Sequence, residues 1–465
     1  FRGDLVRQFL VESIVYSAIS FVLGLFLAWV FLPSFNSLAD KSLVLPWMEW
    51  WLIPIVVSGI LLTGFLAGVY PALYLSAFKP ISVLKGSLSR GSKSSIIRST
   101  MVTFQFATSI VLIICTFVTY QQMAYILNKE IGFDKERVLM IQGANTLGEK
   151  QKGFKEELLR LSQVKHATIS EALPVEGTHR NGNSFWKDGR SKLDEGVGAQ
   201  IWRVDPDYMQ TLGMKLIEGR GFIEDLASDS AAIIINQTMA KKLGLESPVG
   251  ERIMNWQTWT VIGVVEDFHF ESMKGDIESL CFARGDFGSI ISAKIETPDM
   301  ISTIASISDI WGEFMPNQPI RYTFLDKKYA LMYSDVQRTS NVILVFAILA
   351  VIVACLGLFA LSTFMLEQRR KEISIRKVLG ASLRSILNLI TINFLKPVLI
   401  AFVMAVPIGW YMMNRWLEDY TYRIEISWAT FAIAGGTALL IALLTISAES
   451  LKAALADPAE NLRSE

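Results

Sequence analysis

The sequence is poor in the residues that build disulfide frameworks and metal sites. Its 465 residues include 3 Cys and 3 His. Cys115 and Cys355 fall inside apolar runs, and Cys281 is distant from both. This spacing excludes a disulfide framework and the paired ligands of a zinc site, so we predict that the cysteines are packing residues.

The motifs of common enzymes and nucleic-acid-binding proteins are also missing. The sequence contains no GxxxxGK[ST] phosphate-binding loop, no nucleophile–base constellation and no stripe of basic and aromatic residues. A formal net charge of +0 gives no reason to expect a nucleic-acid partner. We therefore predict no catalytic residue, no cofactor and no metal ion bound by this chain.

One short stretch has the residue types of a metal site. In "EDFHFE" (266–271), Asp267, His269 and Glu271 would share one face of a strand, because side chains alternate with period two. The remaining histidines bring no second cluster of ligands near it in the sequence. We therefore favour a structural or surface strand end over a metal site.

Long hydrophobic runs are what the chain has instead. Hydrophobic residues make up 51% of the sequence and the mean hydropathy is +0.38, which is high for a soluble enzyme. Crossing a hydrocarbon core of about 30 Å takes about 20 apolar residues. Buried helices of a soluble all-α protein are the disfavoured alternative. The predicted spans are 9–32, 52–77, 100–123, 341–366, 391–413 and 428–449.

The distribution of charge predicts the orientation. Segments 78–99 and 367–384 are rich in Lys and Arg, which favours the cytoplasm. Loops 33–50 and 414–427 hold more acidic than basic residues and are flanked by tryptophans that suit the outer interface. With six spans, both termini of the chain are then cytoplasmic and residues 124–340 lie outside.

The outer segment has the pattern of a soluble α/β domain. A strand, an amphipathic helix and a strand are expected at the beginning of the segment, and the same order returns near its end. Two such units predict a split βαβ part with a β-rich insert at about 174–275. Residues 327–340 are expected to form a helix that continues into the fourth span. The expected elements of the two units are 137–142, 149–163 and 166–172, then 289–297, 299–314 and 320–326.

The membrane segments contain an internal repeat. Residues 1–86 match about 383–464. Near the end of each copy, a Pro (Pro80 or Pro458) is followed four residues later by a Leu and then by a basic residue. A repeat of this kind predicts a pseudo-two-fold assembly, as in many transporters. We expect the chain to be a piece of a longer protein, with the first copies of the outer domain and of the basic stretch below upstream of Phe1.

A basic stretch between the fourth and fifth spans, "RRKEISIRKVLGAS" (369–382), is the candidate functional site. As a helix it has apolar residues on one side and charges over the rest. A topology anchor, the alternative, needs no apolar face, no interleaved acids and no Gly-Ala break. A helix that docks into a partner's groove needs an apolar face, interleaved acids and a Gly-Ala break. The candidate docking residues are Arg369, Arg370, Lys371, Glu372, Ile373, Ile375, Arg376, Lys377, Leu379 and Gly380.

Several passages together resemble the FtsX-like and MacB-like permeases of ATP-binding-cassette (ABC) transporters, in the eight-span, two-repeat bacterial form without a fused ATPase. The resemblance covers essentially the whole chain. Besides the basic stretch, it is carried by "RVDPDYMQTLGMKLIEGRGF" (203–222), "IIINQTMAKKLGLESPVGERI" (233–253), "VIGVVEDFHFESM" (261–273) and "ADPAENLR" (456–463).

The resemblance implies a division of the chain. Residues 1–86 would end the first membrane repeat, and 87–123 would form a cytoplasmic linker and the third span. Residues 124–340 would be a periplasmic MacB-like core domain with porter-like and inserted halves. Residues 341–465 would form the second membrane repeat, with its coupling helix at 367–381. The expected place is the bacterial inner membrane.

The resemblance also implies the mechanism and the partners. Such permeases relay ATP-driven motion of a separate cytoplasmic ATPase, which binds the ATP and Mg, to the outer domain; this is called mechanotransmission. The substrate could be a lipoprotein, a peptide antibiotic or an efflux substrate. A signalling or scaffold protein that regulates a cell-wall hydrolase or senses antimicrobial peptides is the alternative. Beyond the lipid bilayer and the ATPase, a periplasmic adaptor or an outer-membrane channel stays open as a partner.

Overall fold

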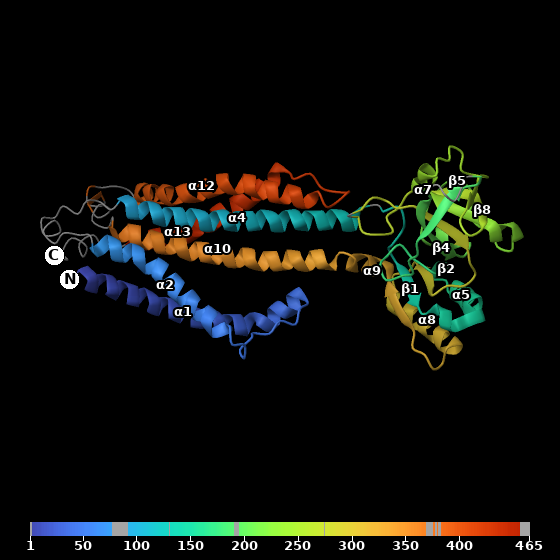
Figure 1. Ribbon diagram of the computed structural model, residues 1–465, viewed down its shortest axis with the longest axis horizontal. Coiled ribbons are helices and arrows are strands. Elements are labelled where there is room, and N and C mark those ends of the chain that lie inside the picture. Colours follow the sequence, from blue (N-terminus) through green and yellow to red (C-terminus); the bar gives the residue numbers. More distant parts are fainter. Residues whose placement is uncertain are drawn as a thin grey trace. The chain divides into compact units, whose positions relative to one another are not determined.

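A computed structural model describes residues 2–76, 92–129, 131–189, 195–273, 275–368, 375–376, 379 and 383–455. The chain forms two compact units (Figure 1). Unit 1 comprises Phe1–Tyr120, Gln337–Asn414 and Ile426–Glu465, and unit 2 comprises Gln121–Val336 and Arg415–Glu425.

Unit 1 is built from long apolar helices. Six helices in the described part of the chain are long and apolar enough to cross a membrane, which confirms the expected number of spans. The first is longer than its apolar run because it continues through Pro33 to Ala39. The helices are α1 Arg2–Ala39, α2 Leu52–Ser76, α4 Ser92–Asn128, α10 Ser334–Gln368, α12 Leu383–Leu417 and α13 Trp428–Leu455.

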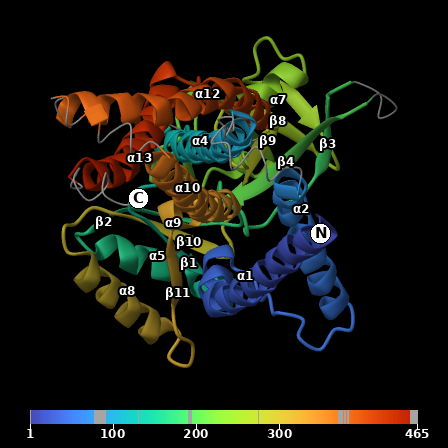
Figure 2. The same ribbon diagram turned by 90° about the vertical axis from the view of Figure 1, so that its left-hand side faces the viewer.

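Small residues let α1 and α2 approach closely. A Cβ atom at Gly64 of α2 would lie 2.8 Å from the Cα of Ile14 in α1, and one at Gly59 would lie 2.7 Å from a ring carbon of Phe21. Helix association between lipid-facing segments relies on such close packing, because lipid chains supply no hydrophobic driving force. The two helices also run side by side in both views (Figures 1 and 2).

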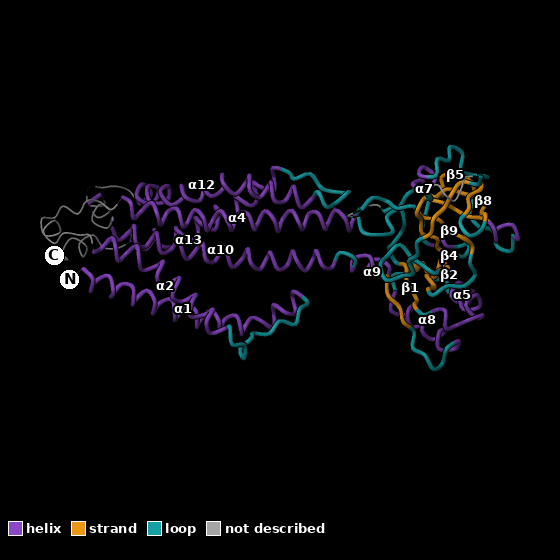
Figure 3. Tube along the Cα trace, in the orientation of Figure 1, coloured by secondary structure: helices purple, strands orange, loops and turns teal. Residues whose placement is uncertain are grey.

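The first part of unit 2 is a four-stranded antiparallel sheet in the order β11-β1-β10-β2. Figure 3 draws the strands of unit 2 in orange. One face of this sheet packs against two helices through an apolar cluster that includes Phe154, Ile307 and Trp311. Both expected strand–helix–strand units are present. Their elements are β1 Val138–Gln142, the 3-10 helix η1 Ala144–Lys150, α5 Gln151–Arg160 and β2 Val164–Ser170, then β10 Ile290–Ile295, α8 Met300–Phe314 and β11 Arg321–Phe324.

The second part of unit 2 is a closed ring of strands, β4-β3-β7-β8-β6-β9, with β9 returning to pair with β4. Strand β9 lies beyond the expected insert 174–275, yet it closes the ring. The elements are β3 Asn183–Lys187, β4 Val197–Val204, α6 Tyr208–Thr211, β5 Leu216–Gly219, η2 Ala227–Ala231, β6 Ala232–Asn236, α7 Gln237–Lys242, β7 Arg252–Met254, β8 Thr258–Val265 and β9 Leu280–Arg284. Unit 2 is thus the mixed α/β domain that the sequence predicts.

Two local expectations differ from the structure. Strand β8 ends at Val265, so "EDFHFE" is not a strand; Phe268 and Phe270 alternate into the core from an extended loop whose His269 N–H donates to the Ile131 carbonyl. The helix expected at 327–340 is two helices, α9 Leu325–Leu331 and α10, separated by a turn in which the buried Tyr333 enters the core.

Candidate functional site

The predicted coupling stretch is described only in part. Ile375 and Arg376 are helical, and the Leu379 N–H donates to the Ile375 carbonyl at 3.0 Å, as in a helical turn. Ile375 is 52% exposed and Leu379 is 80% exposed. Two exposed apolar side chains one turn apart beside a cationic residue are the kind of surface that can enter a partner's groove. The other candidates lie outside the described residues: Arg369, Arg370, Lys371, Glu372, Ile373, Lys377 and Gly380.

The three "EDFHFE" residues do not converge on one point. Asp267 accepts hydrogen bonds from the Thr238 N–H and hydroxyl at 2.9 and 2.7 Å, whereas Glu271 accepts one from the Gln200 amide at 2.8 Å. In the described ranges, no group of three or more His, Cys, Asp or Glu could hold a metal ion. Asp267 and Glu271 thus have structural partners, although the stretch is not the strand end that we expect from the sequence.

The third member of that stretch, His269, is buried against the ring of Tyr422. The two ring centroids lie 4.6 Å apart at 90°. Burial, and after it the nearby Lys129 ammonium, lower the pKa of His269 below its ordinary value. The neutral imidazole is therefore favoured in this position.

The passage "RVDPDY" builds a buried ion cluster instead of a catalytic site. Lys155 of α5 donates to Asp205 at 2.6 Å and to Asp207 at 2.5 Å. Asp205 also accepts hydrogen bonds from the Thr168 hydroxyl and, at 2.9 Å, from the Ile169 N–H of β2. Burial disfavours the charge on Lys155, but the two carboxylates outweigh it and raise its pKa.

The position of this cluster explains its role. Strands β2 and β4 pair only at Ser170 and Val204, so the βαβ part and the strand ring share a single backbone ladder position there. Asp205 directly follows that position and bonds to both β2 and α5. The cluster therefore fastens the two parts of unit 2 to each other.

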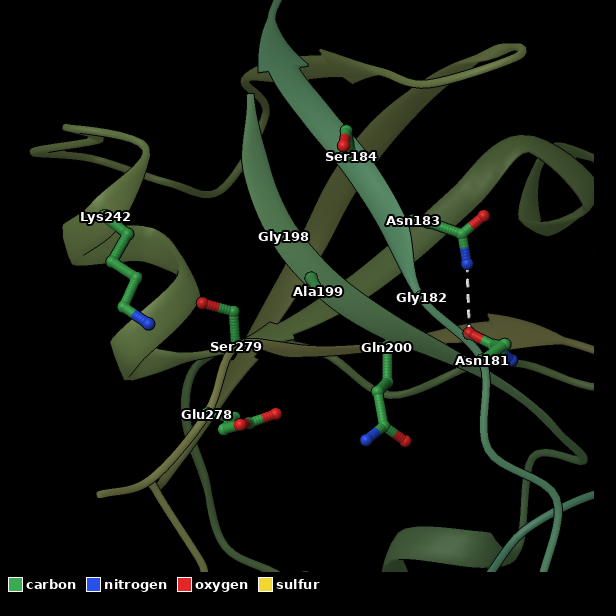
Figure 4. Close-up of a pocket in the computed structure, with 10 residues that line it drawn as sticks. All are labelled: Asn181, Gly182, Asn183, Ser184, Gly198, Ala199, Gln200, Lys242, Glu278 and Ser279. Atoms are coloured by element: carbon green, nitrogen blue, oxygen red, sulfur yellow. Dashed lines mark hydrogen bonds between the residues drawn. The ribbon is translucent and has the colours of Figure 1, made fainter. Parts of the chain in front are cut away.

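A polar pocket of about 470 Å³ opens in the strand ring. Strand β4 pairs with β3 as far as Ala199 and with β9 from Gln200 onward, so a wedge is left where the partners change. Figure 4 shows Lys242 and Ser279 on one side of the wedge and Asn181 and Asn183 on the other. No sequence motif predicted it. Its lining consists of Asn181, Gly182, Asn183, Ser184, Gly198, Ala199, Gln200, Lys242, Glu278 and Ser279.

Fold and site together define a class. The chain is a multi-pass membrane protein with a mixed α/β extramembrane domain. The family model "FtsX-like permease C-terminal" matches residues 2–80 and 344–458, and "MacB-like periplasmic core domain" matches 106–303. Since these matches cover most of the chain, it belongs to the FtsX-like permeases with a MacB-like periplasmic core domain. It is an ABC transporter permease of the MacB, FtsX and YknZ type.

Two relatives with similar sequences have names that agree with this class. The chain is 26% identical over 295 residues to "Uncharacterized ABC transporter permease YknZ" of Bacillus subtilis, an alignment that covers 58% of this chain and 72% of YknZ. It is 25% identical over 211 residues to "Macrolide export ATP-binding/permease protein MacB" of Hahella chejuensis, which covers 41% of this chain and 32% of MacB. The alignment thus spans only 32% of that MacB.

Two solved structures are similar to part of the chain. The periplasmic region of MacB from Actinobacillus actinomycetemcomitans shares 17% identity, covers 42% of this chain and 91% of its own, and has a TM-score of 0.31. The extracellular domain of YknZ from Gram-positive bacteria shares 20% identity, covers 37% and 87%, and has a TM-score of 0.28.

Proposed function

We propose that the chain is the permease subunit of an ABC-type mechanotransmission system. It relays ATP-driven motion of a separate cytoplasmic ATPase to unit 2. The observation that carries the proposal is α4, a single unbroken helix of 37 residues whose residues belong to unit 1 up to Tyr120 and to unit 2 from Gln121. Such a helix is about 55 Å long at 1.5 Å per residue, well beyond a hydrocarbon core of about 30 Å.

The coupling helix 367–381 is the proposed contact with the ATPase. The exposed side chains of Ile375 and Leu379 support this role, because they offer apolar anchors. ATP and Mg would be bound by the ATPase and not by this chain, whose sequence has no phosphate-binding loop of the GxxxxGK[ST] kind. The permease itself would then not be an enzyme.

The proposed location is the bacterial inner membrane. The basic segments 78–99 and 367–384 support cytoplasmic termini and a periplasmic position of 124–340, because Lys and Arg favour the cytoplasmic side. Export or efflux is the favoured task, because the MacB relative carries "macrolide export" in its name. Lipoprotein or peptide handling uses the same relay and is decided by the cargo assay below.

Reconstitution tests the proposal. The full-length permease is co-purified with its ATPase, and ATP hydrolysis is measured in proteoliposomes. We expect Arg376→Glu and Leu379→Ala to weaken ATPase binding at least fivefold and to remove permease-stimulated hydrolysis. Lys41→Glu is the matched control, because Lys41 is an exposed residue of a predicted outer loop. Unaltered binding by both coupling variants would exclude the docking role.

A cargo assay decides the task. ATP-dependent accumulation of a labelled macrolide, lipoprotein or peptide is followed in the same proteoliposomes. Transport of one of them identifies the cargo. ATP-driven motion of unit 2 without transport of any would favour the signalling or scaffold alternative.

A further inference from the structure

The end of α12 and the loop that follows it are part of the extramembrane domain. Residues Arg415–Glu425 belong to unit 2, although the rest of α12 and the whole of α13 are in unit 1. Tyr420 of this loop is 2% exposed and belongs to the aromatic core cluster that also holds Tyr329 and Tyr333. Trp416 and Tyr422 pack against the same cluster. The loop is therefore docked by burial and is not merely a connection at the membrane surface.

A buried glutamine of α4 holds the backbone of this loop. Gln122 is 0% exposed. Its side-chain N–H donates to the Tyr422 carbonyl at 2.8 Å, and the Ile424 N–H donates to its side-chain oxygen at 3.0 Å. The amide thus pairs with a donor and an acceptor two residues apart, as a neighbouring strand would. Leaving a buried amide without such partners is unfavourable, so this pairing is specific.

The side chain of Tyr422 is held as well. The Lys129 ammonium lies 3.5 Å from its ring centroid, and the His269 ring meets it edge-on. Cation–π contact of this kind is attractive. The Thr421 hydroxyl lies 3.4 Å from an Asp276 carboxylate oxygen. The loop is thus bound by the end of α4, by the segment after β8 and by the segment before β9.

We infer that Gln122 is a positioning residue that fastens the α12–α13 hairpin to unit 2 and so gives the relay a further route besides α4 and α10. This inference rests on the proposed mechanotransmission. Because α12 follows the coupling stretch directly in the chain, a displacement of that stretch reaches unit 2 through α12 and the docked loop. Without the amide pairing, the loop would be held only by its packed side chains, and less of the motion of α12 and α13 would reach unit 2.

Hydrogen exchange tests the attachment itself. In the full-length permease, the peptide that contains Ile424 is followed in the wild type, in Gln122→Leu and in Gln210→Leu, a matched change at an exposed Gln. We expect exchange of this peptide to become at least tenfold faster in Gln122→Leu and to stay unchanged in Gln210→Leu. Equal protection in all three proteins would overturn the inference.

A reversible cross-link tests the role in coupling. The ATP-driven change in distance between spin labels at the exposed Val44 and Phe287 is measured in the complex with the ATPase. We expect Gln122→Leu to bind the ATPase normally but to lose at least half of this change. Adding Thr421→Cys with Asp276→Cys should restore the change when the cysteines are oxidised and lose it again on reduction.

The two measurements separate the inference from the function on which it rests. Absence of an ATP-driven change in the wild type would refute the proposed mechanotransmission, while the exchange result would still report on the attachment. A full change in Gln122→Leu despite fast exchange would show that the docked loop carries no motion and would overturn the inference alone.

Discussion

Lys155 and Asp205 form a buried ion pair, with 2.6 Å between Nζ and Oδ2 and side chains only 11% and 5% exposed. The pair stands at the junction between the βαβ part and the strand ring of unit 2. Since neither charge has ready access to water, removing Lys155 would leave Asp205 with its hydrogen bonds from Thr168 and Ile169 but without a compensating charge.

Lys155→Met should therefore destabilise unit 2 by about 3–5 kcal/mol, the usual cost of breaking a buried pair on one side. The measurement is urea unfolding of the detergent-solubilised permease, followed by tryptophan fluorescence. Lys152→Met is the control: Lys152 meets Glu224 at the same 2.6 Å, but the two side chains are 63% and 62% exposed. Exposed pairs contribute little, so equal losses in both variants would contradict the assignment.

Asp229 should make unit 2 sensitive to acid. It is 0% exposed and accepts two hydrogen bonds from the Arg220 guanidinium, at 2.7 and 2.9 Å, and one from the Ile223 N–H. The hydrogen bonds from Arg220 are the main cause that lowers the pKa of the Asp229 carboxyl. The resulting stability is present above the carboxyl's ordinary pKa and is lost as the pH falls through the lower value in the folded protein.

Asp229→Asn should consequently reduce stability near pH 7 and flatten its dependence on pH below about 4, the ordinary range for Asp. Melting temperatures of the permease between pH 7 and pH 3 give this difference. A parallel decline of wild type and variant throughout that range would show that other carboxylates cause the acid loss.

His269 should make the docked loop sensitive to mild acid. Its pKa is lowered by burial and then by Lys129, whereas Asp267 and Asp276 act in the opposite direction. The neutral form is favoured on folding, so its contribution is present above the unfolded value of about 6.5 and decreases as the pH falls below it. Protection of the loop peptide, corrected for intrinsic exchange, should fall from pH 7.5 to pH 5.5.

His269→Gln is the matching variant, because its side chain does not titrate. Its loop protection should depend less on pH than that of the wild type. An identical pH dependence in both proteins would exclude His269 as the titrating group.

Gly64 should be essential for the close packing of α1 on α2. A methyl group there would lie 2.8 Å from the backbone of Ile14, whereas a Cβ at Gly24 meets nothing within 4 Å. Ser17 and Thr63 face each other between the two helices, with 2.5 Å between their oxygens. Cross-linking of Ser17→Cys with Thr63→Cys should fall several-fold on adding Gly64→Ala and stay unchanged on adding Gly24→Ala.

Much of the architecture follows from local patterns. The spans were predictable because a run of about 20 apolar residues has few stable states other than a membrane helix. The strand–helix–strand units were predictable because Phe154 and Leu158 repeat at helical spacing between β-rich runs. The coupling stretch follows from its composition and place in the chain, and its docking role stays a prediction.

The sequence pattern was misleading at "EDFHFE". Phe268 and Phe270 alternate as in a strand, but alternation says only that two side chains enter a core. Whether the backbone between them joins a ladder depends on a neighbour. Here the His269 N–H donates to the carbonyl of Ile131, which is not in a strand, so the chain leaves the sheet.

The sequence by itself determined the helices that cross the membrane, the order of elements in the βαβ part and the absence of common catalytic motifs, because these depend on residues close together in the chain. The tertiary structure alone decided that β9 closes the strand ring with β4, that Lys155 meets Asp205, and that Gln122 holds Tyr422. Gln122 and Tyr422 are 300 residues apart. Their pairing depends on which surfaces the completed fold brings together, and no local period records that.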